Sequence, residues 1–176
     1  AGGATSTVTV TVRDANGNVI PGATVVLAAS GTGNTLTQPA AVTNASGVAT
    51  GTVASTVAEA KTLTATANAI AITDNAIVTV TPGAVSATLS TVTATPASIV
   101  AGAATSVVTV TARDANGNLI QGATVALAAT GSGNTLTQPA AVTDAGGVAT
   151  GTIASTIAAA KSVSATISSV AITQTA

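Results

Sequence analysis

The chain has 176 residues, of which four are basic and five are acidic, and it contains no Cys, His, Met, Phe, Tyr or Trp. These absences argue against disulfides, imidazole or thiolate zinc sites, cysteine nucleophiles and a general base that titrates near neutral pH. The formal net charge of −1 is too weak to neutralise a nucleic-acid backbone. We therefore expect no enzyme activity, no cofactor, no small-molecule substrate and no nucleic-acid partner. No apolar run of about 18 residues occurs, so we expect no membrane insertion in this segment.

The dominant pattern is an internal repeat. Residues 1–76 align with residues 101–176 without a gap, and 54 of these 76 pairs are identical. A unit of roughly 100 residues can hold its own hydrophobic core, whereas solenoid repeats of about 20 to 50 residues need their neighbours. The repeat therefore predicts two tandem domains, residues 1–82 and 83–176.

The first predicted strand, residues 5–13, alternates Val with Thr. A period of two is typical of a strand with one buried face. The same alternation returns 100 residues later. The predicted buried face carries Val8, Val10 and Val12 in the first copy, and Val108, Val110 and Ala112 in the second.

A turn and further short strands follow. Asp, Asn and Gly crowd residues 14–18, and Gly17 can adopt the positive φ that such turns need. Residues 58–60 are helix formers, but three residues between β-rich runs cannot nucleate a helix, so we expect a turn there. Short strands at regular spacing predict an all-β fold, with an antiparallel β-sandwich in each domain. The remaining predicted strands of the first copy cover residues 23–29, 48–55, 61–67 and 77–81, and a strand over residues 87–95 opens the second copy.

Three segments carry a resemblance to a known family. They read VTVRDANGNVIPGATVVL, TNASGVATGTVAST and AKTLTATA in the first copy, and VTARDANGNLIQGATVAL, TDAGGVATGTIAST and AKSVSATI in the second. The chain resembles the bacterial immunoglobulin-like group 1 repeats of the invasin and intimin family of surface adhesins. The resemblance implies two tandem immunoglobulin-like antiparallel β-sandwiches in an extracellular stalk on the bacterial cell surface, although the aromatic residue common in the family's strands is absent here.

Two functions are compatible with this pattern. In the first, the chain is the structural stalk of a bacterial cell-surface adhesin, a semi-rigid spacer whose partners are neighbouring immunoglobulin-like domains. The second starts from residues 77–81 and 87–95, which have no counterpart in the other copy, so that domain 1 lacks an opening strand and domain 2 a closing strand. Strands from other copies of the chain could fill these gaps, making it the subunit of an extracellular filament that polymerises head-to-tail by β-strand donation. A substrate-binding accessory module is a third interpretation, which no aromatic platform supports.

The turn residues are also weak calcium candidates, because three oxygen-bearing side chains stand at alternate positions, as at the start of a calcium loop. The loop glycine, however, comes at the fourth position rather than the sixth, and no Glu follows at the twelfth. Turn chemistry alone explains these residue types, so the sequence assigns no metal. The candidates are Asp14, Asn16 and Asn18 in the first copy, and Asp114, Asn116 and Asn118 in the second.

Two other patterns invite a functional interpretation. Lys61 and Lys161 are candidates for an intramolecular isopeptide bond to an Asn or Asp, which needs a nearby acid. Glu59 is the nearest acid in the first copy, but Ala159 stands at that place in the second. A solvated Lys at the start of a strand is therefore the favoured interpretation. Rows of alternating Thr resemble ice-binding arrays, but Thr suits any exposed strand and sheet twist works against a flat array.

Overall fold

The computed structural model describes all residues 1–176, which divide into two compact units, residues 1–81 and 82–176. All fourteen regular elements are strands, so the predicted all-β fold is confirmed. Every strand pairing is antiparallel. No helix of a length and hydrophobicity that could cross a membrane is found.

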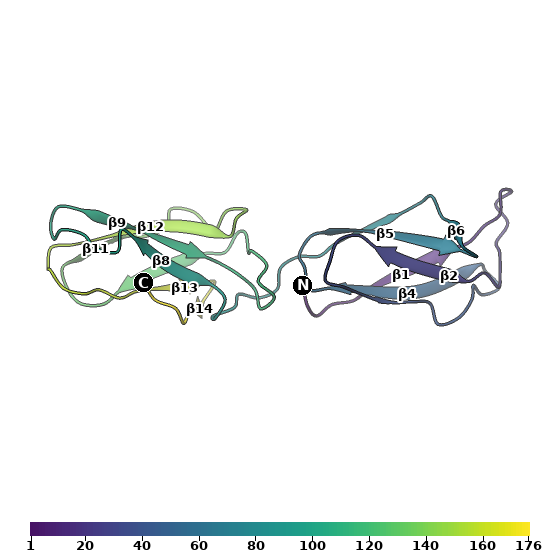
Figure 1. Cartoon of the computed structure of the whole chain (residues 1–176), viewed down its shortest axis with the longest axis horizontal. Helices are drawn as coiled ribbons and strands as arrows, with labels where there is room; N and C mark the ends of the chain where they lie inside the picture. Colours follow the sequence, from purple (N-terminus) through teal and green to yellow (C-terminus); the bar gives the residue numbers. More distant parts are fainter. The chain divides into compact units, whose positions relative to one another are not determined.

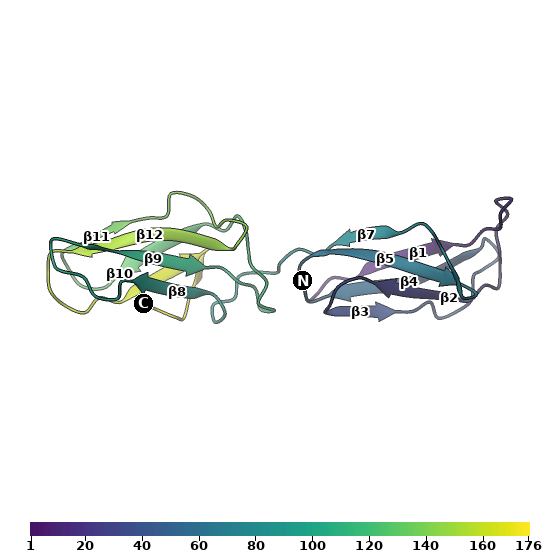
Figure 2. The ribbon, with the colours of Figure 1, turned by 45° about the horizontal axis from the view of Figure 1, so that its top comes forward.

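The first unit stacks two sheets of short strands (Figure 1). One sheet has the order β1-β4-β3, and in the other β5 pairs with β2 on one side and with β6 and β7 on the other. Figure 2 shows β7 alongside β5. The strands are β1 (Ser6–Thr11), β2 (Val25–Ala29), β3 (Asn34–Thr37), β4 (Val48–Ser55), β5 (Ala60–Ala67), β6 (Ile70–Ala71) and β7 (Ala76–Thr79).

The second unit repeats this plan, except that its additional strand, β8, pairs with β9, whereas β7 of the first unit pairs with β5. Its larger sheet has the order β11-β12-β9-β8, and the smaller one has the order β10-β13-β14. Figure 2 shows β8 at the edge beside β9. The strands are β8 (Thr91–Thr95), β9 (Thr105–Thr111), β10 (Val125–Ala129), β11 (Asn134–Thr137), β12 (Val148–Ser155), β13 (Val163–Ile167) and β14 (Val170–Ala171).

The hydrophobic core of each unit lies between its two sheets. The predicted inward face is confirmed, since Val108, Val110 and Ala112 are fully buried and their counterparts Val10 and Val12 are 9% and 7% exposed. Val8, the counterpart of Val108, is only half-buried. Gly51 on β4 has no room for a side chain, because a Cβ there would lie 2.4 Å from the Thr37 carbonyl oxygen.

Some element boundaries differ from the predictions. The expected strand 87–95 begins at Thr91, because residues 87–89 form a turn in which the Ser90 amide donates to the Ser86 carbonyl. The short strands β3 and β6 were not expected at all. The expected strand 77–81 is β7, shifted by one residue at its start and two at its end.

Candidate functional site

The predicted turn over residues 14–18 is held together by Asp14. Its Oδ1 accepts the backbone N–H groups of Asn16 and Asn18 at 2.9 and 2.8 Å, and its Oδ2 accepts the Asn18 side-chain amide. Gly17 has a φ of 85°. The hydrogen bond from the Asn18 side chain is the main cause that lowers the pKa of Asp14, and the backbone amides add to it.

Asp114 makes the same turn in the second unit and has one more partner. Its Oδ2 also accepts the backbone N–H of Gly83 at 2.8 Å, in the segment that leads into β8. Asp114 is 1% exposed, whereas Asp14 is exposed. Burial alone would raise the pKa of Asp114, but the hydrogen bonds from the Asn118 side chain and the backbone of Gly83 outweigh it, so the pKa is lowered.

In each copy the calcium candidates lie together in one turn, where the Asp carboxylate accepts hydrogen bonds from amide N–H groups. In both copies the Asp carboxylate accepts N–H groups from the Asn residues two and four positions later. No group of three or more His, Cys, Asp or Glu side chains that could hold a metal occurs. Asx-turn geometry thus accounts for the carboxylate contacts, and calcium binding stays a hypothesis.

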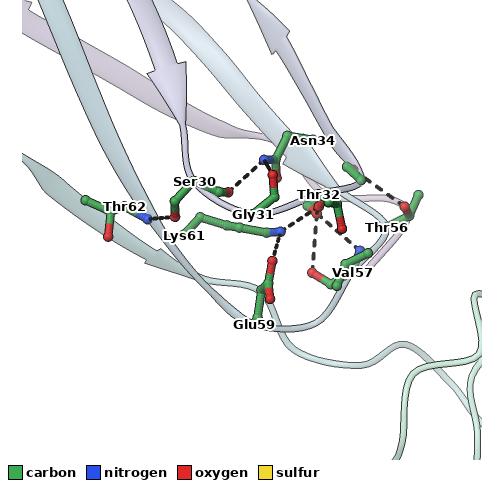
Figure 3. Close-up of polar contacts among 11 residues, drawn as sticks. Ser30, Gly31, Thr32, Asn34, Thr56, Val57, Glu59, Lys61 and Thr62 are labelled. Atoms are coloured by element: carbon green, nitrogen blue, oxygen red, sulfur yellow. Dashed lines mark hydrogen bonds and ion pairs between the residues drawn. The ribbon is translucent and has the colours of Figure 1, made fainter.

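Lys61 is fully buried, so the prediction of a solvated Lys is wrong for the first unit. Its ammonium donates to the Thr32 carbonyl at 2.7 Å and forms an ion pair with Glu59 (Figure 3). The hydrogen bond from Lys61, followed by its positive charge, lowers the pKa of Glu59. β7 pairs with β5 at this point, with Val78 opposite Lys61. The acid that isopeptide chemistry would need is thus in contact with the Lys, and the covalent bond itself stays a hypothesis.

Lys161 lies in a more open setting. Its ammonium donates to the Ser132 carbonyl at 2.8 Å, but Ala159 supplies no acid and no strand pairs with residues 160–162. Lys161 instead lines a groove of 720 Å³, together with Pro96, Ile99 and Ile157. The groove lies beside residues 160–163, the counterparts of the β5 residues that pair with β7 in the first unit.

The matching gap in the first unit lies along β1. In the second unit β8 pairs with β9, but β1 has no strand on its outer side. A groove of 290 Å³ runs beside this edge. It is lined in part by Val8, Val10, Leu27, Leu63 and Ile72.

The sequence did not lead us to expect that the Gln38 side chain covers the outer edge of β2. The Gln38 side chain accepts the backbone N–H of Leu27 at 2.7 Å and donates to its carbonyl at 2.9 Å. It therefore occupies the outer edge of β2 as a neighbouring strand would. Gln138 does the same to Leu127. The only signal in the sequence was that residues 33–43 are identical in both copies.

Comparison with known proteins gives a consistent result. A model of the bacterial Ig-like domain (group 1) matches the chain twice, over residues 1–81 and 88–176. A solved structure of Yersinia pseudotuberculosis InvD is 30% identical to this chain, with a TM-score of 0.69. The match covers 97% of this chain and 52% of the InvD chain. No curated protein matches the sequence.

Two further solved structures show the fold. The Escherichia coli adhesin FdeC is 22% identical with a TM-score of 0.61, over 97% of this chain and 57% of that one. Invasin, a bacterial integrin-binding protein, is 18% identical with a TM-score of 0.66, over 97% of this chain and 36% of the invasin chain. The chain thus spans about half the length of InvD and FdeC, and less of invasin. Both copies share the family's sequence pattern and sandwich fold, and the chain belongs to the family of bacterial Ig-like domains of group 1.

Proposed function

We propose that this chain is a stalk segment of a bacterial cell-surface adhesin, in which two tandem domains, residues 1–82 and 83–176, act as a semi-rigid extracellular spacer. The observation that carries the proposal is the tandem match of both copies to the bacterial Ig-like domain of group 1. The same fold occurs in an adhesin and in an integrin-binding protein. The role is mechanical and not enzymatic. The partners are neighbouring immunoglobulin-like domains.

The connection between the two domains supports the semi-rigid part of the proposal. The Val80 amide donates to the Glu59 carbonyl within the first unit at 3.0 Å. The Gly83 amide donates to Asp114 within the second unit at 2.8 Å. Only two residues, Thr81 and Pro82, lie between these anchored positions, and Pro has a fixed φ. Such a short tether leaves the domains few ways to reorient.

A distance measurement between spin labels tests this proposal. The chain has no Cys, so the double variant Thr35→Cys and Thr135→Cys carries labels at two equivalent, exposed positions and nowhere else. We expect a narrow distance distribution for the native connection. The matched control inserts four Gly and Ser residues between Thr81 and Pro82, which should broaden it. An equally broad distribution in both proteins would contradict a semi-rigid spacer.

Surface labelling tests the location. An antibody raised against residues 1–176 should label intact bacterial cells that express the gene, and protease added to intact cells should remove the label. Antibody access only after the cells are broken open would contradict an extracellular stalk, whatever the domain flexibility.

The filament remains a second candidate, because β1 has an open edge that a donated strand could fill. Its weakness is that the strands available for donation, β7 and β8, already pair with β5 and β9 of their own units. Sedimentation over a range of protein concentrations separates the two candidates. Polymers that grow with concentration support the filament, and a monomer at all concentrations supports the spacer.

A further inference from the structure

We propose that Asn44 is the acceptor of an N-linked glycan, which a glycosyltransferase attaches from an activated sugar donor. Asn44, Ala45 and Ser46 form the acceptor pattern Asn-X-Ser, with a residue other than Pro in the middle. Every other Asn of the chain lacks a Ser or Thr two positions later, so the pattern occurs once. The proposal does not depend on the stalk function, since a filament subunit would carry the same site.

The site lies in the turn before β4. The side-chain Oδ1 of Asn44 accepts the backbone N–H groups of Ser46 and Val48 at 2.9 and 3.1 Å. Asn44, Ala45 and Ser46 are all exposed, so an enzyme can reach them. Hydrogen bonds to an amide oxygen stabilise the imidate form, in which that oxygen carries negative charge. The turn thus polarises the Asn44 amide in the direction that attack by its Nδ2 requires.

Two atoms of the pattern have no role in the turn. Neither the Nδ2 of Asn44 nor the Oγ of Ser46 makes a hydrogen bond to another protein group. In contrast, the Nδ2 of Asn34 donates to the Ser30 carbonyl at 2.8 Å. Glycosyl transfer uses both free atoms, because Nδ2 is the nucleophile and the hydroxyl two positions later is what defines the acceptor pattern.

The second copy builds the same turn without the pattern. Asp144 stands in place of Asn44, and its Oδ1 accepts the N–H groups of Gly146 and Val148 at 2.8 and 2.9 Å. The fold therefore needs only the oxygen that Asn and Asp share. The changes from Asn to Asp and from Ser to Gly remove Nδ2 and the hydroxyl and leave the turn intact. Turn chemistry accounts for the oxygen acceptor in both copies, but not for the Asn-X-Ser pattern of the first.

A glycan here would improve the solvation of an apolar surface. Val42, two residues before Asn44, is 50% exposed, and its counterpart Val142 is 49% exposed. The chain has only four basic and five acidic residues, so few charges are available to keep such side chains in solution. The second copy has the carboxylate of Asp144 at this place, whereas Asn44 is uncharged. Sugar hydroxyls on Asn44 would supply polar groups where the second copy has a charge.

The reaction is a glycosyl transfer to an amide nitrogen. Nδ2 of Asn44 forms a bond to C1 of the sugar, while the bond between C1 and a phosphate oxygen of the donor breaks. The phosphate leaves with the electron pair, one Nδ2 proton passes to a base of the transferase, and nothing is oxidised or reduced. The donor is therefore a sugar joined through C1 to a diphosphate, which either a nucleotide or a polyprenyl lipid carries.

Mass analysis of the protein purified from the bacterium that carries the gene tests this proposal. Trypsin releases residues 14–61 and 114–161 as equivalent peptides, because each follows an Arg and ends with a Lys. We expect added sugar mass on Asn44 in the first peptide and none on Asp144 in the second, with fragmentation assigning the sugar to one residue. A single sugar would indicate a nucleotide-linked donor, and an oligosaccharide would indicate a lipid-linked one.

Variants expressed in the same cells provide matched controls. Ser46→Ala should abolish the modification and Ser46→Thr should retain it, and neither should disturb the turn, because the Ser46 Oγ has no hydrogen bond in it. The double variant Asp144→Asn with Gly146→Ser transfers the pattern to the second copy, and we expect sugar to appear there. Gly146 has no positive φ, so a Ser fits its backbone. Unchanged hydrogen exchange at the Val48 amide verifies the turn in the Ser46 variants.

Three outcomes would overturn the proposal. The first is an unmodified Asn44 in protein from the native cells. The second is sugar confined to Thr or Ser side chains, which would mean that the hydroxyls and not the amide are the acceptors. The third is equal modification of Ser46→Ala and Ser46→Thr. None of these results bears on the spacer, which the spin-label distances test separately.

Discussion

The two units are almost the same sequence in different surroundings. Val108 is fully buried and Val8 is half-buried, and Asp114 is 1% exposed while Asp14 is exposed. Both differences follow from β8 and the segment before it, which cover β9 but have no counterpart beside β1. The comparison teaches that one edge strand, rather than the local sequence, decides whether a position shared by the two copies belongs to the core or to the surface.

The opposite difference occurs at the other end of the sandwich. Lys61 is fully buried, whereas Lys161 is half-buried and lines a groove. Here the first unit has the additional strand, β7, and also Glu59 as an ionic partner. Each unit therefore has one edge that is better covered than its twin. Paired substitutions at equivalent positions can measure what each covering strand contributes.

The largest difference is expected between Val108→Asp and Val8→Asp. A carboxylate at position 108 would be buried without a partner, and we expect it to destabilise the second unit by about 4 kcal/mol or more. At position 8 the carboxylate can reach water at the open edge, so the loss should be about 1 kcal/mol. Hydrogen exchange resolved by residue measures each unit separately. Equal losses would mean that β8 does not determine the burial of this position.

A smaller difference is expected between Asp114→Ala and Asp14→Ala. Both substitutions leave the turn amides without their acceptor, but only Asp114 also holds the Gly83 amide. We expect a loss of about 2 to 3 kcal/mol in the second unit and a clearly smaller loss in the first. Faster exchange of the Gly83 amide in Asp114→Ala would show that the carboxylate fixes the segment before β8. Unchanged exchange there would contradict that role.

Acid should affect the Lys61 cluster in a predictable direction. The folded-state pKa of Glu59 is lowered from its usual value of 4.5 by the hydrogen bond and charge of Lys61. Its contribution to stability is therefore fully present above pH 4.5 and is lost as the pH falls through the folded pKa. We expect Glu59→Gln to lower the melting temperature of the first unit slightly at neutral pH, and to make no difference at the acid end of the titration.

A matched substitution in the second unit controls for this effect. Ala159→Glu places an acid near Lys161, which is partly exposed, so the added ion pair should change the stability of that unit little. Thermal unfolding of both variants across the acid range is the measurement. A loss in Glu59→Gln that persists unchanged at low pH would show that the charge of Glu59 is not its cause.

Much of the fold could be predicted because alternation and burial agree along the sandwich strands. The inward face of Val108, Val110 and Ala112 is such a case. The start of β8 was missed because residues 87–90 alternate like a strand, yet Ser86 draws them into a turn with its backbone and its Oγ. The burial of Lys61 was missed although a period of two places it on the same face as buried Leu63.

The parts that escaped prediction depend on contacts distant in sequence. Lys61 is buried because the loop at Thr32 and the strand at Val78 meet around it, and neither is visible in a local pattern. Gln38 pairs with Leu27, which lies 11 positions earlier, and a polar side chain gives no periodic signal. The open edge of β1 could be foreseen only by comparing the two copies.

The smallest difference between the units is expected at Gln38 and Gln138. Gln38 makes two hydrogen bonds to Leu27, and Gln138 makes at the same two atoms the equivalent bonds to Leu127. Replacing either Gln by Ala exposes the backbone groups of the edge strand, and we expect a loss of about 1 to 2 kcal/mol in each unit. The two losses should agree within about 0.5 kcal/mol, because the local surroundings are the same. Chemical denaturation followed by residue-resolved exchange measures both. A clear inequality would mean that the units differ in overall stability for reasons beyond their covering strands, and the paired comparisons at Val8, Asp14 and Glu59 would then need correction for it.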